Sequence, residues 1–231
     1  MQLKIDNLYK EYNKKNVLSG INFTFESGKI YGIIGRNGAG KTTFFRALNK
    51  DIITDKGEIT LDNSMLLTSD IGFVTAEENV PEFLTAKEFL TFFLEANESK
   101  IKNKKTIPEY FEMIDLSEKD QNKIMKEYSK GMKNKVEMLI NIINSPKILL
   151  LDEPLTSLDI VVQEQIKKIL KEEKKDKIIM LSTHILDIAL DLCDEILILN
   201  NGTLELIEKE DINTKKYKDK IINALKDNKN D

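Results

Sequence analysis

The sequence predicts an α/β protein with a mainly parallel β-sheet, an antiparallel β subdomain at its start and a helical subdomain inserted in the middle. Short strand-like runs separated by turns occupy the first third of the chain, and a helical pattern covers about residues 84–139. After that segment, strand-like and helix-like runs alternate. Strands joined by crossover helices form parallel sheets, whereas short strands joined by turns pair antiparallel. The order of the elements therefore indicates the fold class.

The elements of the first half follow from apolar spacing and turn residues. The predicted strands, with Gly28 and Gly57 as breaks, are Met1–Asn7, Asn22–Glu26, Lys29–Ile34 and Glu58–Asp62. From Leu84 to Leu94, apolar residues recur at helical spacing, with Thr85 as an N-cap candidate and Glu88 three residues later. This pattern predicts a helix within the helical subdomain, which we place at about residues 80–140.

The second half alternates between strands and helices. The predicted strands are Ile148–Asp152, Ile178–Ser182, Glu195–Leu199 and Thr203–Ile207, and the predicted helices are Val161–Glu173 and Ile185–Cys193. Asn201-Gly202 predicts a hairpin turn before the last strand. We expect one domain over residues 1–208, followed by a charged C-terminal tail over residues 209–231. A solvated helix is the expected form of this tail, and a docking element is the alternative.

Composition excludes several classes of protein. The formal net charge is −4, so the chain lacks the basic character typical of nucleic-acid binding, and no nucleic-acid partner is expected. No secretory signal is visible at the N-terminus, and no apolar stretch approaches the ~20 residues of a membrane-spanning helix. The single cysteine, Cys193, excludes an internal disulfide and fits a packed side chain in a reducing cytoplasm. We expect a protein that reaches a membrane only through a partner.

Residues Gly35–Thr42 have the sequence G-x-x-x-x-G-K-[ST] of a phosphate-binding P-loop, between a predicted strand and a helix-like run. Glycines let consecutive backbone N–H groups point at a phosphate, and the N-terminus of the following helix adds partial positive charge. Lys41 would reach the β- and γ-phosphates, and Thr42 would offer a hydroxyl to Mg²⁺. A glycine-rich turn that binds nothing is the alternative, but the flanking elements favour a nucleotide site.

Two further positions carry polar side chains at the ends of predicted strands. Asp152 follows the apolar run Ile148–Leu151 and fits the Walker B role of holding Mg²⁺, while Glu153 could polarise the water that attacks the γ-phosphate. His184 follows the strand Ile178–Ser182 at its carboxyl end, where ligands of parallel sheets collect. The alternatives are an acidic turn before Pro154 and an ordinary surface or core histidine. The P-loop upstream favours a role in phosphate chemistry.

The segment Tyr128-Ser129-Lys130-Gly131-Met132 resembles the L-S-G-G-Q signature of ATP-binding cassette (ABC) proteins. Together with the motifs above, it makes residues 1–207 resemble an ABC transporter ATPase subunit, with six motifs in the order of that family. The resemblance implies a P-loop NTPase fold with a RecA-like core, and ATP and Mg²⁺ as cofactors. It also implies that ATP is bound between the P-loop of one subunit and the signature of another.

The resemblance assigns a role to each matching position. The catalytic residues would be Lys41, Glu153 and His184. The ATP-binding residues would be Tyr12, Val17, Gly35, Asn37, Gly38, Ala39, Gly40, Lys41, Thr42 and Thr43. The residues that contact the ATP of a facing subunit would be Ser129, Lys130 and Gly131. The D-loop would contain Ser157 and Asp159, and the Mg²⁺ ligands would be Thr42 and Asp152. Tyr12 would stack on adenine, with a packing or surface tyrosine as the alternative.

Two segments depart from the pattern of the family. In Ile71-Gly72-Phe73-Val74-Thr75-Ala76-Glu77, Ala76 stands where the Q-loop glutamine is expected, and a methyl group can neither ligate Mg²⁺ nor orient water. Substitution by Glu77 or Glu78, and a loop that only relays motion to the membrane partner, both remain open. The Y-S-K-G-M form of the signature resembles a subgroup of exporters of peptides, drugs or lipids. We interpret both departures as lineage variation rather than loss of activity.

The resemblance implies an ATP-hydrolysing subunit of an ABC exporter. Its expected partners are a second ATPase subunit, in a homodimer or heterodimer, and an integral membrane permease. The expected location is the cytoplasmic face of the cell membrane, through that permease. The alternative is a soluble ABC ATPase of a non-transport scaffold, such as one in iron–sulfur cluster assembly. A nucleotide-sensing module without turnover is a third possibility, but it conflicts with the presence of Glu153 and His184.

Overall fold

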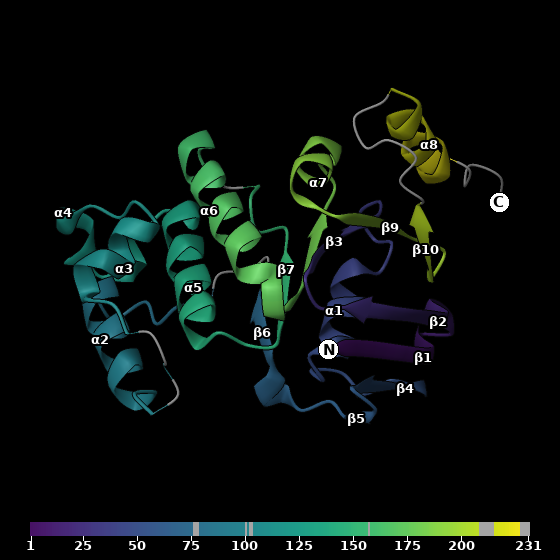
Figure 1. The fold of residues 1–231 in the computed structure, drawn as a ribbon, viewed down its shortest axis with the longest axis horizontal. Helices are drawn as coiled ribbons and strands as arrows, with labels where there is room; N and C mark the ends of the chain where they lie inside the picture. Colours follow the sequence, from purple (N-terminus) through teal and green to yellow (C-terminus); the bar gives the residue numbers. More distant parts are fainter. Residues whose placement is uncertain (76–78, 100, 102–103, 157, 208–214, 227–231) are drawn as a thin grey trace.

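The computed structural model describes residues 1–75, 79–99, 101, 104–156, 158–207 and 215–226, and these form two β-sheets (Figure 1). One sheet is antiparallel, with the strand order β2-β1-β4-β5. Its strands are β1 (Gln2–Tyr12), β2 (Lys15–Glu26), β4 (Lys56–Leu61) and β5 (Ser64–Met65). The predicted antiparallel β subdomain at the start of the chain is confirmed.

The first two strands are longer than the sequence predicted. β1 pairs with β2 from Gln2 opposite Glu26 to Tyr12 opposite Lys15, with several register shifts along the hairpin. One shift follows Ile5, and within it Asn7 has a left-handed φ of 51°. A bulge of this kind interrupts the alternation of side chains between the two faces of a strand. The strand prediction therefore stopped at Asn7, although the pairing continues beyond it.

The second sheet has the strand order β10-β9-β3-β8-β7-β6. Its strands are β3 (Lys29–Ile34), β6 (Ile71–Val74), β7 (Ile148–Asp152), β8 (Ile178–Thr183), β9 (Glu195–Asn200) and β10 (Thr203–Ile207). Only the pair β9–β10 is antiparallel among these neighbours. The parallel strands therefore present their carboxyl ends at one edge. The sequence did not predict β6, because its four residues are too few to show a period.

The helices of the described residues are α1 (Lys41–Leu48), α2 (Ala86–Ala96), α3 (Ile107–Met113), α4 (Glu118–Gln121), α5 (Lys130–Asn144), α6 (Ile160–Glu173), α7 (Leu186–Leu192) and α8 (Lys215–Lys226). Three 3₁₀ turns lie at Thr68–Asp70, Met125–Glu127 and Lys174–Asp176. The predicted cap of α2 is confirmed, because the Thr85 hydroxyl accepts the Glu88 N–H at 3.1 Å and the Glu88 carboxylate accepts the Thr85 N–H at 2.9 Å. Helices α2, α3 and α4 lie at the end of the molecule opposite the antiparallel sheet, with α5 between them and β6 (Figure 1).

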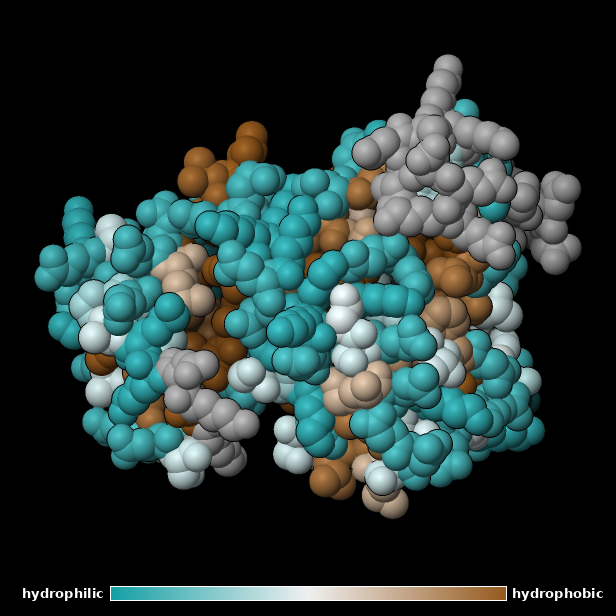
Figure 2. Space-filling view, in the orientation of Figure 1, coloured by the Kyte–Doolittle hydropathy of each residue, from teal (hydrophilic) through white to brown (hydrophobic). Residues whose placement is uncertain are grey.

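Side chains of the parallel strands enter two separate apolar cores. In β3, Ile30 and Ile34 belong to the core shared with α2, α5 and α6, whereas Tyr31 and Ile33 belong to the core shared with α1 and the antiparallel sheet. Because both faces are buried, the strands appear in the sequence as unbroken apolar runs. The outer face drawn in Figure 2 is accordingly mostly hydrophilic. Both faces of the sheet that carries the carboxyl edge are therefore packed against other elements.

Helix α8 packs on the parallel sheet beside β9. Tyr217 and Ile221 are only 3% and 0% exposed, and the Tyr217 hydroxyl donates to the Ile207 carbonyl at 3.2 Å. The expectation of a solvated helix is therefore wrong at these two positions. The sequence suggested only a weak apolar face, because few apolar residues are scattered among many lysines and aspartates. Ala224 and Leu225 also pack against the same core, so one face of the helix is attached to the domain.

Cys193 is buried at the end of α7, as the sequence predicted. Its sulfur packs on Gly32 of β3, where an added Cβ would come within 2.9 Å of Sγ. Burial raises the pKa of the Cys193 thiol, and the nearby Asp194 and Asp191 carboxylates raise it further. This thiol is a packing group and is not poised for reaction.

An ion pair joins the chain just before β6 to the chain just before β7. Asp70 Oδ1 lies 2.8 Å from Lys147 Nζ, and Asp70 Oδ2 accepts the Leu67 N–H at 3.2 Å. The hydrogen bond from Lys147 lowers the pKa of Asp70, against the opposing effect of burial. Because the folded-state pKa is the lower one, the pair stabilises the fold above the unfolded-state pKa of about 3.9. That stabilisation is lost as the pH falls through the folded-state pKa.

We expect Asp70→Asn to lower the free energy of unfolding by about 1 kcal/mol at pH 7, because Lys147 is half-exposed and the pair is partly screened. The difference from the wild type should shrink as the pH falls below the unfolded-state pKa of about 3.9 and through the lowered folded-state pKa of Asp70. Urea denaturation at pH 7 and at an acidic pH below the lowered pKa of Asp70 measures the free energy of unfolding. Lys147→Met should likewise lower it at pH 7 and have less effect at the acidic pH. An equal loss at both pH values would contradict this assignment.

Candidate functional site

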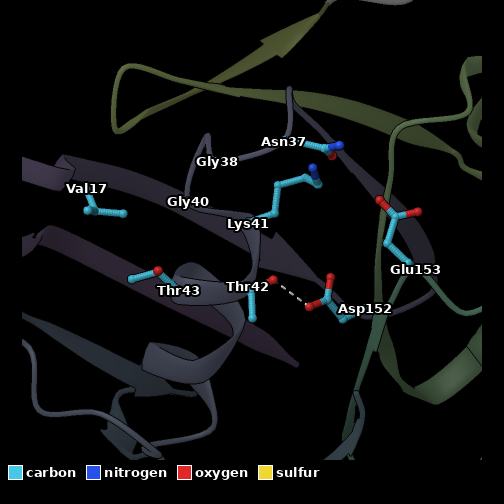
Figure 3. Close-up of a pocket in the computed structure, with 9 residues that line it drawn as sticks. All are labelled: Val17, Asn37, Gly38, Gly40, Lys41, Thr42, Thr43, Asp152 and Glu153. Carbon is cyan, nitrogen blue, oxygen red and sulfur yellow. Dashed lines mark hydrogen bonds between the residues drawn. The ribbon is translucent and has the colours of Figure 1, made fainter. Parts of the chain in front are cut away.

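Residues Gly35–Thr42 form a loop between the carboxyl end of β3 and the start of α1 (Figure 3). Gly40 immediately precedes the helix and has a φ of 102°, a left-handed conformation that favours glycine. An added Cβ at Gly40 would also lie 3.0 Å from Val17 Cγ1, and one at Gly35 would lie 2.7 Å from the Leu199 carbonyl oxygen. The loop needs glycine at these positions to fit between β2 and β9.

The Lys41 side chain lies along this loop and is 7% exposed. Its Nζ donates to the Gly35 carbonyl at 2.8 Å and to the Arg36 carbonyl at 3.3 Å. Figure 3 shows the side chain extending toward Asn37 and Glu153, across the space between the loop and the end of β7. The ammonium is thus held at the pocket by carbonyls that carry only partial charge. A phosphate would be a stronger acceptor for the same donor.

Asp152 lies at the end of β7, is 2% exposed, and has both carboxylate oxygens bonded. Thr42 Oγ1 donates to Oδ2 at 2.7 Å, and Ser182 Oγ donates to Oδ1. Ser182 was missing from the sequence prediction. Its signal was a polar residue at the end of an otherwise apolar strand, and the register of β7 on β8 places it directly opposite Asp152. The serine fixes the carboxylate beside the P-loop threonine.

The Thr42 and Asp152 oxygens suit a hard cation such as Mg²⁺. The described residues contain no group of three or more His, Cys, Asp or Glu side chains that could hold a metal by themselves. Mg²⁺ commonly takes one or two protein carboxylates, with phosphate oxygens and water completing its octahedron. A site of one carboxylate and one hydroxyl next to a phosphate-binding loop fits that requirement.

Glu153 has a left-handed φ of 53°, a strained conformation for a residue with a side chain. Its backbone N–H donates to the Ser182 carbonyl at 3.2 Å, and its Oε1 lies 2.9 Å from His184 Nδ1. Its Oε2 is buried and has no hydrogen-bond partner among the described residues. One carboxylate oxygen is therefore oriented by the histidine, while the other can accept a proton from a bound water.

The structure brings most of the predicted nucleotide-site residues together. A pocket of about 360 Å³ is lined by Val17, Asn37, Gly38, Gly40, Lys41, Thr42, Thr43, Asp152 and Glu153. Gly35 and Ala39 belong to the same loop, and His184 contacts Glu153. Tyr12 is at the end of β1 and does not line this pocket. Its ring is half-exposed, with Lys10 Nζ 5.0 Å from the ring centroid.

The predicted signature residues lie outside this pocket. Ser129 caps α5, with its hydroxyl accepting the Met132 N–H at 3.3 Å, and it is exposed, as is Lys130. Gly131 follows in the first turn of the helix. None of the three lines the P-loop pocket of its own chain. The N-terminus of α5 is therefore separate from the P-loop pocket of its own chain.

The remaining predicted positions are only partly covered by the structure. Asp159 caps α6, accepting the Val162 N–H at 3.1 Å. Ser157 of the predicted D-loop lies outside the described residues. So do Ala76, Glu77 and Glu78 of the predicted Q-loop. The interpretation of the Q-loop departure stays a prediction.

A model of the ABC transporter family matches residues 18–156, which span the loop, the signature segment and the end of β7. The chain belongs to the ABC transporter family. It is the ATP-binding subunit, an ABC ATPase that binds and hydrolyses ATP. The predicted P-loop NTPase fold is confirmed by the same comparisons.

Two curated relatives illustrate this membership. The chain is 36% identical over 203 residues to an uncharacterized ABC transporter ATP-binding protein of Methanocaldococcus jannaschii, covering 87% of this chain and 75% of the relative. It is 33% identical over 215 residues to the lantibiotic transport ATP-binding protein SrtF of Streptococcus pyogenes, covering 90% of each. Both similarities extend across the helical subdomain.

Among solved structures, the chain superposes on a dimeric ATP-binding cassette in a post-hydrolysis state, bound to ADP and Pi. The TM-score is 0.73 at 25% identity, covering 89% of this chain and 99% of the other. Within the described residues, no helix of this ABC ATPase combines the length and the apolar composition needed to cross a membrane.

Proposed function

We propose that this ABC ATPase powers an exporter by driving a separate integral membrane permease, with peptides, drugs or lipids as the class of cargo. The exposed N-terminus of α5 carries the proposal. Ser129 is exposed and lies outside the pocket that contains Lys41, so its hydroxyl can face ATP held by another subunit. The Y-S-K-G-M signature and a relative named for lantibiotic transport support export.

Each half of the proposed site supplies different groups. One subunit holds the β- and γ-phosphates with Lys41 and the N-terminus of α1. A facing subunit adds the Ser129 hydroxyl and the Gly131 N–H at the γ-phosphate. The relative solved as a dimer with ADP and Pi supports this pairing. ATP stabilises the paired state because it binds the closed interface better than the separated subunits.

Hydrolysis in this proposal depends on positioning and electrostatics. Glu153 accepts a proton from the attacking water, and His184 orients the Glu153 carboxylate while contacting the γ-phosphate. Thr42 and Asp152 would hold Mg²⁺, which would supply positive charge to neutralise the phosphates. Tyr12 provides a stacking face for adenine. Loss of the γ-phosphate removes the bridge between subunits, so the dimer opens and the permease changes its facing.

Affinity purification of the tagged chain from detergent-solubilised membranes tests the proposal. We expect a polytopic membrane protein to co-purify and the isolated complex to hydrolyse ATP. Recovery of soluble partners alone would count against an exporter and would favour the scaffold alternative. A parallel purification with an unrelated tagged cytoplasmic ATPase controls for non-specific recovery of membrane proteins.

A further inference from the structure

We propose that Asn134 is a positioning residue that couples the signature helix α5 to the catalytic base of the same subunit. The coupling runs from Ser129, through Asn134, to the loop that follows Glu153. The inference rests on the proposed function, because it requires Ser129 to contact ATP held by a second subunit. It goes further by linking the two ATP sites of the dimer through one side-chain amide in each subunit.

The Asn134 amide bonds to the residue next to Glu153. Asn134 Nδ2 donates to the Pro154 carbonyl at 3.1 Å, and the residue is 8% exposed. The Pro154 carbonyl can only accept, so the orientation of the amide is determined by this contact. Asn134 Oδ1 is buried and has no hydrogen-bond partner among the described residues. Burial of an unpaired amide oxygen costs stability, and an apolar residue would avoid that cost. The contribution of asparagine at this position is therefore its hydrogen bond to the Pro154 carbonyl.

The same loop is held from its other side by α6. Gln163 Nε2 donates to the Leu155 and Leu158 carbonyls, each at 3.0 Å. Thr156 Oγ1 donates to the Glu153 carbonyl at 3.0 Å. Side chains therefore bind the carbonyls along the connection from β7 to α6. Both α5 and α6 pack in the same apolar core, so a displacement of α5 relative to α6 would act on the loop through Asn134.

The path from Ser129 to Asn134 is stiff. Ser129 is the N-cap of α5, and Asn134 lies five residues later, in the second turn of the helix. The Ser129 hydroxyl accepts the Met132 N–H, and the Ser129 carbonyl accepts the Lys133 N–H at 3.1 Å. A displacement of Ser129 by a facing γ-phosphate would therefore carry Asn134 with it. The adjoining Glu153, with its strained φ, then shifts relative to His184 and the P-loop.

Such coupling has to be reciprocal. If ATP at the signature of one subunit improves the placement of that subunit's Glu153, the state of its own site also changes its affinity for the facing ATP. The two sites should therefore hydrolyse ATP cooperatively, and the cooperativity should depend on the Asn134 hydrogen bond.

The test is Asn134→Asp in the co-purified transporter complex, because aspartate keeps the shape but cannot donate to the Pro154 carbonyl. We expect kcat for ATP to fall about tenfold, equivalent to about 1.4 kcal/mol of barrier, with KM changed by less than about twofold. The Hill coefficient for ATP should fall toward 1. Asn134→Gln, which retains an amide donor, should recover part of both parameters.

Asn141→Asp is the matched control. Asn141 lies on the same helix, and its Nδ2 donates at 2.9 Å to the Glu137 carbonyl within α5, with no bond to the loop. The Asn141→Asp variant should have nearly the same kcat and Hill coefficient as the wild type. Gln163→Met, which releases the loop from α6 instead, should lower kcat while preserving cooperativity. Thermal denaturation identifies variants that fail to fold, and Asn134→Ala replaces Asn134→Asp if the buried charge is not tolerated.

The outcomes separate the two proposals. A wild-type complex that does not form or does not hydrolyse ATP refutes the proposed function. An active wild-type complex with a Hill coefficient of about 1, or an Asn134→Asp complex with wild-type kcat and cooperativity, overturns the coupling alone. A loss of kcat in Asn141→Asp equal to that in Asn134→Asp also overturns it, because general weakening of α5 would then explain the effect.

Discussion

Glu153→Gln is expected to lower ATP turnover by about 10²–10⁴-fold, the range typical of losing a positioned general base. The amide keeps the size of the side chain and can still contact His184, which lies 2.9 Å from Oε1 in the wild type. It cannot accept the proton of the attacking water. ATP binding at Lys41 and Thr42 should be retained, because neither residue depends on the Glu153 carboxylate for its hydrogen bonds.

The same variant should accumulate as an ATP-bound dimer, because opening follows hydrolysis in the proposed cycle. Size-exclusion chromatography coupled to light scattering, with saturating ATP and Mg²⁺, measures this. Glu172→Gln, which neutralises an exposed carboxylate on α6, is the matched control and should behave as the wild type. A Glu153→Gln protein that stays monomeric under these conditions would contradict the binding of ATP between two subunits.

Lys41→Ala is expected to weaken ATP binding by about tenfold to a hundredfold, and to abolish measurable turnover. A hydrogen bond to a charged group contributes about 1.5–3 kcal/mol, and Lys41 lines the pocket and contacts the loop that would hold the phosphates. The substitution also leaves the Gly35 and Arg36 carbonyls without this donor, so the loop itself is expected to loosen.

Isothermal titration with ATP and with ADP measures the loss. The ATP-specific part of the effect should exceed the ADP part, since the ammonium is proposed to reach the γ-phosphate. Lys168→Ala, at an exposed position of α6, is the control for general loss of positive charge. Unchanged ATP affinity and turnover in Lys41→Ala would refute the assignment of Gly35–Thr42 as the phosphate-binding loop.

The sequence predicted the fold class because its signals are local and unambiguous. Strands buried on both faces give unbroken apolar runs, and the P-loop and Asp152-Glu153 each lie at the end of such a run. β6 and the full length of β1 were not predicted, because a four-residue strand and a bulged hairpin lack a clean period. These elements depend on pairing with neighbours that are distant in the sequence.

In the candidate site, too, some residues could be predicted from local sequence signals and others depend on contacts between distant segments. The side chains around the P-loop could be predicted because the motif specifies them by spacing. Ser182 could not, since its role follows only from the register that sets β7 against β8. The contact between Asn134 and Pro154 is equally invisible in the sequence, because it joins a helix to a loop twenty residues away. Contacts of this kind need the tertiary structure.

The burial of Cys193 has a practical consequence for following the motions of this ATPase. The thiol is shielded by Gly32 and α7, and its raised pKa leaves almost no thiolate at neutral pH. Maleimide dyes attack thiolates, so the native protein should stay unlabelled in its folded state. A single cysteine introduced on the exposed surface would then be the one reactive position, and fluorescence transfer between labelled subunits could follow closure and opening without removing the native residue.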